Sequence, residues 1–537
     1  MKRFSFIMFA ALGLLGCSDK ATEPATPVNK GELERSYISV TLRSDDDTRA
    51  DGEKEFEDGE AEERIVKSLY FFLFDSKGRP FDLGDGKNYK AVDVNESGND
   101  PDASGADGVP NVSDVKNRVF VFDNYVGQYP AKIVAVLNWT PTPGAGAYSL
   151  DALAEQMVAL KGVGDAFVMS NAVYVAESNN TAAKKETIRA TALTIDNIAK
   201  DEATALANPV KISVERVAAK VTLKTNKENL YDIGEEVNGT KVYARVLGWE
   251  LYNAYNKSYL LKSINPEWTP TEVGFNWNDP TWFRSYWAIS LKYPFGEENK
   301  LSYEDLTNVV DASDYCGENT YNENRTKVVV KAELVRQVDD TYEAVEIAKW
   351  YGGDYLGEVA LRTVVANTLA SQLYYLEGAE YRSICFDDLK VVEANEANPN
   401  TQAELKPYHV FFQLSEQGEE KEWYTYSSAE GFIAANMASV NVILGGVEPA
   451  LLYKGGQAYY HTDIKHLGDS GSTAEFGVVR NHVYKVNITD ITGYGTPVYD
   501  GTSDFINLEK PEDIVTYVSA QINILSWRVV ANDYELN

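Results

Sequence analysis

The chain has 537 residues, and its 50 lysines and arginines are outnumbered by 81 aspartates and glutamates, which gives a net charge of −31. This length is too great for one hydrophobic core, so two large domains are expected. The acidic balance excludes nucleic acid as a partner and disfavours anionic membrane surfaces, because both would repel the protein.

The first segment of the chain is typical of an export signal. Lys2 and Arg3 form its positive start, and residues 4–15 are almost wholly apolar. This apolar core is shorter than the roughly 20 residues that span a bilayer. It ends in the lipobox pattern Leu14-Leu15-Gly16-Cys17, in which the thiol is the group that receives the lipid. We therefore predict Cys17 to be the lipidated residue; the alternative is an ordinary secretion signal with a chance cysteine.

The next segment combines a tether, a strand and a loop. Residues 18–35 are rich in Pro, Thr, Glu and Lys, which predicts a flexible tether. Residues 36–42 alternate between apolar and polar, which predicts a half-buried strand whose inner face carries Ile38, Val40 and Leu42. The acidic residues 43–63 predict an exposed loop.

Strands predominate in the rest of the chain, where Val, Thr and Tyr recur. They are predicted over residues 65–74, 131–137, 210–223, 241–252, 327–335, 408–413 and 478–488. One helix is predicted from its cap Ser149 through Leu160, with Gly162 closing it, and a second over residues 364–376. This pattern predicts two antiparallel β-sandwich domains in series, divided within the polar stretch 226–238.

An isolated segment, residues 515–534, ends the chain after a Gly-rich linker. Its alternation has one phase at Val518, Ala520, Ile522 and Ile524 and slips by one to Leu525, Trp527 and Val529. A β-bulge would produce this slip. A strand on such a linker has two uses, because it can fold back into its own sheet or add to the sheet of a neighbour.

Motifs that suggest chemistry have better structural explanations. The Gly-Asp-Ser-Gly stretch 468–471 resembles a serine-protease loop, but it lacks the usual continuation and its residues are turn formers. His461 and His466 would lie on opposite faces of a strand, without further metal ligands. Residues 100–111 begin like a calcium loop but end in Asn where a Glu is needed. We predict no catalytic residue, no metal site and no cofactor.

Two cysteines remain besides Cys17. They are Cys316 and Cys385, and their spacing leaves open whether they pair in an oxidising compartment.

Several stretches, in this order, resemble the Mfa-like major subunits of type V fimbriae from Bacteroidia, within the fimbrial pilin superfamily. The sharpest match is Gly477–Tyr484, with the sequence GVVRNHVY. The others are Thr48-Arg49-Ala50 after the first strand, VERVAAKV at 214–221, GWELY at 248–252, YCGENT at 315–320 and ILSWRV at 524–529.

The resemblance implies how the protein functions. The precursor would reach the outer membrane as a lipoprotein, and an Arg-specific protease would cut between Arg49 and Ala50. The cut would release the first strand and open an apolar groove, which the C-terminal donor strand of another copy would fill with Ile522, Ile524, Leu525, Trp527 and Val529. Arg43 and Arg64 are alternative cut sites, and Arg49 as a plain loop residue is the remaining alternative.

The resemblance also orders the chain. It implies a signal peptide (1–17), a propeptide (18–49), an N-terminal domain (50–228), a C-terminal domain (229–495) and a linker with the donor strand (496–537). The predicted function is a non-enzymatic, adhesive stalk subunit with further copies, anchor and tip subunits as partners, extracellular when mature. The alternatives are an anchor or tip subunit, and a surface lipoprotein that binds glycan or protein without polymerising.

Overall fold

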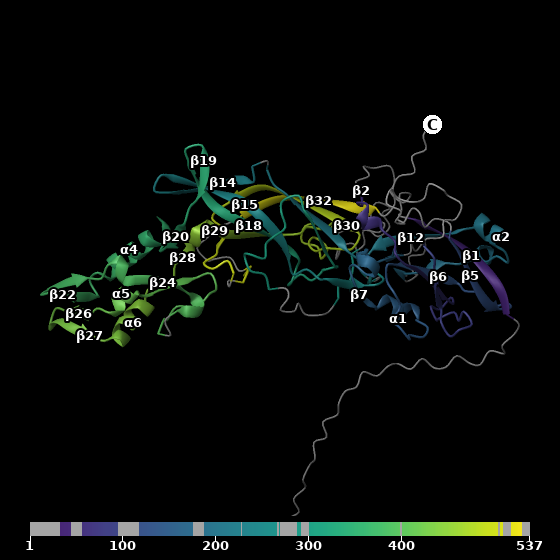
Figure 1. Cartoon of the computed structure of the whole chain (residues 1–537), viewed down its shortest axis with the longest axis horizontal. Helices are drawn as coiled ribbons and strands as arrows, with labels where there is room; N and C mark the ends of the chain where they lie inside the picture. Colours follow the sequence, from purple (N-terminus) through teal and green to yellow (C-terminus); the bar gives the residue numbers. More distant parts are fainter. Residues whose placement is uncertain are drawn as a thin grey trace, which may run out of the picture.

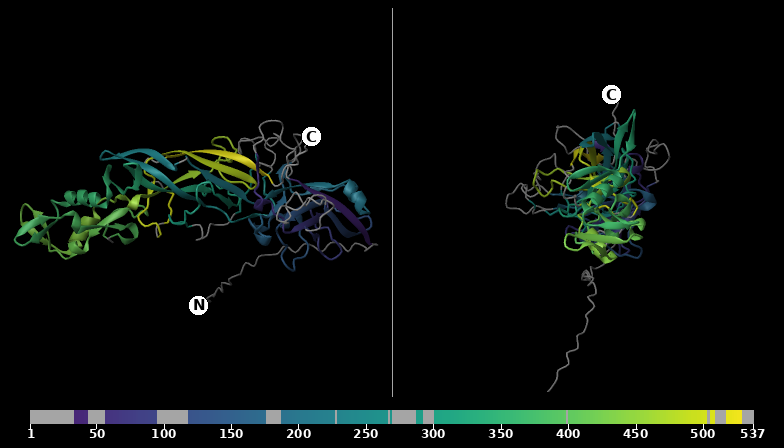
Figure 2. Two further views of the ribbon diagram at one scale, coloured as in Figure 1. Left: turned by 45° about the horizontal axis from the view of Figure 1, so that its top comes forward. Right: turned by 90° about the vertical axis from the view of Figure 1, so that its left-hand side faces the viewer.

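The computed structural model shows an elongated, mainly β protein, as the sequence predicts. It describes residues 33–43, 56–94, 118–175, 187–226, 228–265, 268, 287–291, 300–397, 400–502, 505–508 and 517–528. The N-terminal part lies at one end of the long axis, and a lobe built from residues 347–453 lies at the other (Figure 1). Figure 2 shows the same body after rotation, on the right viewed close to its long axis.

The N-terminal domain is built on one mixed sheet with the strand order β4-β3-β6-β8-β12-β1-β5, and β11 pairs with β6 beside it. Aromatic and β-branched residues fill its strands, and they pack into one continuous core that includes Phe71, Phe120 and Ile212. The strands are β1 (Leu33–Arg43), β3 (Leu69–Phe74), β4 (Tyr89–Val92), β5 (Arg118–Tyr125), β6 (Lys132–Leu137), β8 (Met169–Asn171), β11 (Thr191–Ala192) and β12 (Val210–Arg216).

The C-terminal domain is a sandwich, because two sheets contribute side chains to one core. The first sheet has the order β17-β13-β30-β32-β2, and its strands are β17 (Ser313–Cys316), β13 (Ala219–Lys224), β30 (His482–Thr492), β32 (Tyr517–Arg528) and β2 (Phe56–Asp58). The second has the order β14-β15-β18-β29-β31, and its strands are β14 (Leu230–Val237), β15 (Thr240–Tyr252), β18 (Lys327–Val338), β29 (Gln457–Asp463) and β31 (Thr496–Pro497).

A third hydrophobic core, absent from the sequence prediction, forms the far lobe. It collects buried residues between Ala348 and Leu452, which come from both helices and strands. Its helices are α4 (Gly357–Leu369) and α6 (Met437–Gly445), and its strands include β20 (Ile347–Trp350), β22 (Tyr374–Glu377), β25 (Val410–Leu414) and β26 (Trp423–Ser427). The strands here are short, so their alternation is too brief to stand out in the sequence.

Both predicted helices differ from the structure. Helix α1 (Leu150–Ala154) has the predicted cap, since Ser149 Oγ accepts a hydrogen bond from Ala152 N at 3.1 Å, but it ends well before Leu160. Residues Met157–Ala159 instead form strand β7, which pairs with β16 (Lys257–Tyr259). Helix α4 starts earlier than predicted and stops at Leu369, because Tyr374 and Tyr375 pair with β26.

The strand predicted over residues 210–223 is two strands in two different sheets. Strand β12 ends at Arg216 and belongs to the N-terminal sheet, whereas β13 begins at Ala219 and pairs with β30. The two cores accordingly separate between Ala218 and Ala219, before the polar stretch 226–238 where the sequence places the boundary.

Candidate functional site

The first described strand, β1, lies inside the N-terminal sheet. It pairs in parallel with β12, from Val40 with Val210 to Arg43 with Ser213, and antiparallel with β5 along its other edge. Its inward residues Ile38, Val40 and Leu42 are at most 1% exposed and belong to the domain core. Because β5 pairs only with β1 in the described part of the sheet, β1 is what connects β5 to the other strands.

Polar contacts fix the first half of β1 and leave one group unsatisfied. Tyr37 and Ala199 exchange two backbone hydrogen bonds of 2.9 Å, and Ser36 Oγ donates to Asn124 Oδ1 at 2.7 Å. The hydroxyl of Ser39 is buried and has no partner among the described atoms. An unpaired buried hydroxyl costs about 1–3 kcal/mol.

The C-terminal segment folds back onto its own domain as β32. It pairs antiparallel with β30, from Tyr517 opposite Thr492 to Ser526 opposite His482, and in parallel with β2 on its other edge. Val518 and Ala520 pack against the C-terminal core. For Ile522, Ile524, Leu525 and Trp527 the structure describes the backbone pairing alone, and Val529 lies outside the described residues.

The predicted bulge within this segment is wrong. The pairing of β32 runs without a shift from Ala520 to Ser526, across the place where the sequence phase slips. The irregularity lies in the partner strand β30, between Ile488 and Asp490, so Thr489 is the extra residue.

Charged side chains are buried where the two domains meet. The side chain of Glu63 is 3% exposed. Its carboxylate pairs with Lys220 Nζ at 2.9 Å and accepts a hydrogen bond of 2.6 Å from the Tyr315 hydroxyl. Burial raises the pKa of Glu63, but the bonds from Tyr315 and Lys220 outweigh it and hold the pKa below its usual value. The loop predicted as exposed over residues 43–63 therefore ends in a buried anchor, because partners far along the chain compensate the charge.

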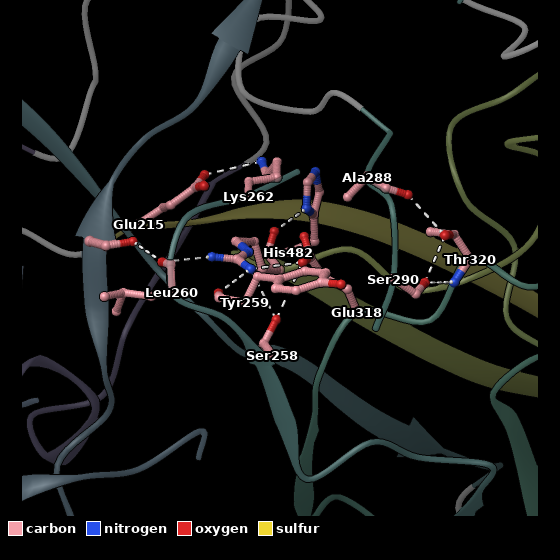
Figure 3. Close-up of polar contacts among 12 residues, drawn as sticks. Glu215, Ser258, Tyr259, Leu260, Lys262, Ala288, Ser290, Glu318, Thr320 and His482 are labelled. Atoms are coloured by element: carbon pink, nitrogen blue, oxygen red, sulfur yellow. Dashed lines mark hydrogen bonds and ion pairs between the residues drawn. The ribbon is translucent and has the colours of Figure 1, made fainter. Parts of the chain in front are cut away.

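Two further buried ion pairs continue this junction (Figure 3). Lys262 Nζ lies 3.1 Å from Glu215, with both side chains fully buried. Arg480 pairs with Glu318 at 2.8 Å and also donates to the carbonyls of Tyr259 and Leu260, at 2.6 and 3.2 Å. These hydrogen bonds offset part of the free-energy cost of burying the charges.

Two of the motifs that resemble fimbrial subunits, VERVAAKV at 214–221 and GVVRNHVY at 477–484, meet in this junction. Asn481 N donates to Ala218 O at 2.8 Å, and Asn481 Oδ1 accepts from Arg216 N at 3.2 Å. Gly477 has a φ of 131°, and a Cβ there would lie 2.7 Å from Asn319 O, so glycine is required. The predictions from the sequence do not include this junction. Its signal in the sequence is the presence of charged residues at 215, 216 and 220 inside an otherwise apolar strand pattern.

The motifs that suggest chemistry have structural roles or lie outside the structure. His466 contacts the Tyr484 hydroxyl through Nδ1 at 2.9 Å and is 6% exposed. Among the described residues, no group of three or more potential ligands is placed to hold a metal ion. Cys316 and Cys385 are both free thiols, so they do not pair. The stretch 100–111 lies outside the described residues.

The predicted lipidation and cleavage residues, like Val529, are not among the residues that the structure describes. Cys17, Arg49 and Ala50 lie outside the described residues. Within the residues that are described, no helix has the length and apolar character that crossing a membrane requires.

Residues 451–533 match the family described as the major fimbrial subunit protein type IV, Fimbrillin, C-terminal. This match includes β30 and β32 and confirms the resemblance to fimbrial subunits. No curated protein matches the chain.

Several solved structures are also similar to the chain. A fimbrilin from Porphyromonas gingivalis W83 is 12% identical, with 92% of this chain and 98% of that chain covered and a TM-score of 0.33. The tip fimbrial protein from the same species, with a C-terminal truncation, is 14% identical, with coverage of 92% and 100% and a TM-score of 0.27. A fimbrial assembly protein from Parabacteroides distasonis ATCC 8503 is 10% identical, with coverage of 75% and 100% and a TM-score of 0.27.

The buried junction predicts a large effect of one neutralised charge. Glu318→Gln leaves the Arg480 guanidinium buried without its counter-charge, so urea unfolding should show a loss of about 3 kcal/mol or more. The matched control is Glu304→Gln, which breaks a pair with Lys331 whose carboxylate is 53% exposed and should cost less than about 1 kcal/mol. Equal losses in the two variants would contradict a special role for the junction.

A second prediction concerns pH. Burial, followed by a hydrogen bond and repulsion from Asp314, raises the pKa of Glu250 in β15 from its usual 4.5 to about 8. The fold therefore favours the protonated carboxyl, and this stabilisation is complete below pH 4.5 and lost as pH rises through about 8. The free energy of unfolding should fall between pH 5 and pH 9 by more in the wild type than in Glu250→Gln. Identical slopes would disprove this assignment.

Proposed function

We propose that this chain is a stalk subunit of an adhesive fimbrium and polymerises by exchange of its C-terminal strand. It is exported as a lipoprotein through Cys17, and an Arg-specific protease cuts between Arg49 and Ala50. The lipid leaves with β1, and the C-terminal segment of another copy takes its place. The observation that carries the proposal is the position of β1, which is part of the core yet lies upstream of the cut.

The donor segment has the right spacing for this groove. The buried residues of β1 alternate at Ile38, Val40 and Leu42, and the same spacing recurs at Leu525, Trp527 and Val529. The lengths also agree, since β1 has 11 residues and β32 has 12. Burial of five apolar anchors, the three above with Ile522 and Ile524, would contribute about 7–15 kcal/mol as an upper bound.

The segment just after the cut supports a coupled release of the donor strand. Strand β2 covers the outer edge of β32, pairing Phe56 with Ser526 and Asp58 with Arg528. It is followed closely by the anchor at Glu63, which holds this part of the chain in the junction. A cut at Arg49 turns β2 from a segment fixed at both ends into one with a free start. β2 would then bind the edge of β32 less firmly, so β32 would detach from β30 more easily.

The N-terminus of the mature protein separates the stalk function from the alternatives, which are an anchor or tip subunit and a surface lipoprotein that binds glycan or protein. An anchor or binder would keep an acylated Cys17, whereas a stalk subunit sheared from the cell surface would begin at Ala50. A tip subunit has no need to donate a strand, so the matched C-terminal segment favours a stalk position. Other copies, the anchor and tip subunits and the protease are the partners of this proposal.

Charges among the apolar anchors of the donor strand should stop assembly. Ile522→Asp with Trp527→Asp places one carboxylate on each face of the strand among apolar side chains, so we expect folded monomers and no ladder of multimers on unheated gels. The control is Ser519→Asp with Gln521→Asp, which adds the same charge at two polar positions outside the five anchors and should keep the ladder. An unchanged ladder in the first variant would refute strand exchange.

Two engineered disulfides test separately whether a subunit accepts a strand and whether it donates one. Ser39→Cys with Val119→Cys ties β1 to β5, and Lys485→Cys with Asn523→Cys ties β32 to β30, because each pair is directly opposite in register. Each locked protein, in a Cys385→Ser background and after cleavage, should stay monomeric by size-exclusion chromatography. Mixed together they should form one-to-one dimers, since one can still donate and the other can still accept.

Reduction provides the internal control for the locks. Added dithiothreitol should restore long multimers from either protein alone, because both strands are then free to exchange. Polymerisation of either oxidised protein at the wild-type rate would show that its locked strand takes no part in assembly.

A further inference from the structure

A cavity of about 790 Å³ opens on the N-terminal sheet. It lies where β6 stops pairing with β8 and pairs with β11 instead, so the sheet divides at this point. Its walls come from β6, β8, β11 and β12 and from the two-stranded unit of β9 (Tyr174–Val175) and β10 (Thr187–Ile188). The volume is typical of sites that take small ligands.

The buried side-chain amide of Asn171 bonds to the strands at the point where the sheet divides. Asn171 is 2% exposed, and its side chain accepts from Ala135 N at 2.8 Å. The same side chain donates to Ile133 O at 3.3 Å and to Thr191 Oγ1 at 3.2 Å. These bonds replace the ladder between the strands, so the cavity is a built feature of the sheet and no packing defect.

The charge of the cavity is opposite to that of the chain. Lys77, Lys132, Lys211 and Arg189 line it, and Asp151 is the one acidic residue among its lining residues. Asp151 is already paired with Arg189 at 2.9 Å. None of the three lysines forms an ion pair in the described structure, although the chain has 81 acidic residues. Gathered like charges repel one another, and a bound anion would relieve this repulsion.

We infer that this cavity binds an acidic saccharide, a sugar that carries a carboxylate. The three lysines supply the attraction for the carboxylate, and the hydroxyl groups of Tyr174, Thr187 and Thr191 on the same walls suit a polyhydroxylated ring. A lone inorganic anion would leave most of the volume unfilled. The inference is independent of strand exchange, since every lining residue belongs to the N-terminal sheet and its neighbours, so binding is expected in the uncut precursor as well.

The test is calorimetric titration of the full chain at low salt with digalacturonic acid and 3′-sialyllactose. Lactose serves as the uncharged match, triglutamate as an acidic peptide and sodium sulfate as a simple anion. At least one of the two acidic saccharides should bind in a salt-sensitive manner and tighter than lactose, triglutamate or sulfate. Lys132→Gln with Lys211→Gln should weaken that binding at least tenfold.

A matched variant controls for the loss of two charges. Lys224→Gln with Lys390→Gln removes two exposed lysines outside the cavity and should bind like the wild type. Circular dichroism of all variants verifies that they are folded. The inference is overturned if neither acidic saccharide binds the wild type, if triglutamate or sulfate binds as tightly as the better one, or if the cavity variant retains full affinity.

Discussion

The position of β1 between β12 and β5 is the constraint on which the N-terminal domain depends. β5 has no other strand partner in the described sheet, and the side chains of Ile38, Val40 and Leu42 belong to the core of the domain. Loss of β1 without replacement would expose an apolar groove and remove the backbone pairing that connects β5 to the described sheet. A strand that is both indispensable and located at the beginning of the chain is suited to exchange, because another strand must then take over its place.

Buried ion pairs lie where the two β domains meet. One short run of chain, β12 followed by β13, passes directly from the first sheet into the second, and the pairs Glu63–Lys220, Glu215–Lys262 and Glu318–Arg480 surround this passage. Breaking such a pair leaves an unpaired buried charge, so the domains resist separation. In a stalk joined by strand exchange, tension between neighbours would run through this junction.

Electrostatics sets a further condition on assembly. Copies with a net charge of −31 repel one another, so in the proposed polymer the attraction between subunits would have to come from apolar burial and backbone pairing rather than from charge. Salt should therefore favour association by screening. The basic cavity is a local exception to the acidic surface, and it lies on the same domain as the groove but away from the inner face of β1.

The sequence by itself determined the elements whose pattern is local. Alternation located β1, stretches rich in Val, Thr and Tyr indicated β15, β18 and part of β30, and Ser149 predicted the cap of α1, because such local patterns need no distant partner. The family resemblance likewise rests on short contiguous motifs, two of which lie within the match over residues 451–533.

Tertiary structure alone decided the features that depend on distant partners. It split the strand at 210–223 between two sheets, shortened α1 so that Met157–Ala159 could pair with β16, and buried Glu63 against Lys220 and Tyr315. It also moved the bulge from β32 to β30 and gathered the cavity's lysines from separate strands and turns. A periodic pattern reports which face of an element is apolar, but which element it pairs with is settled only by packing of the whole chain.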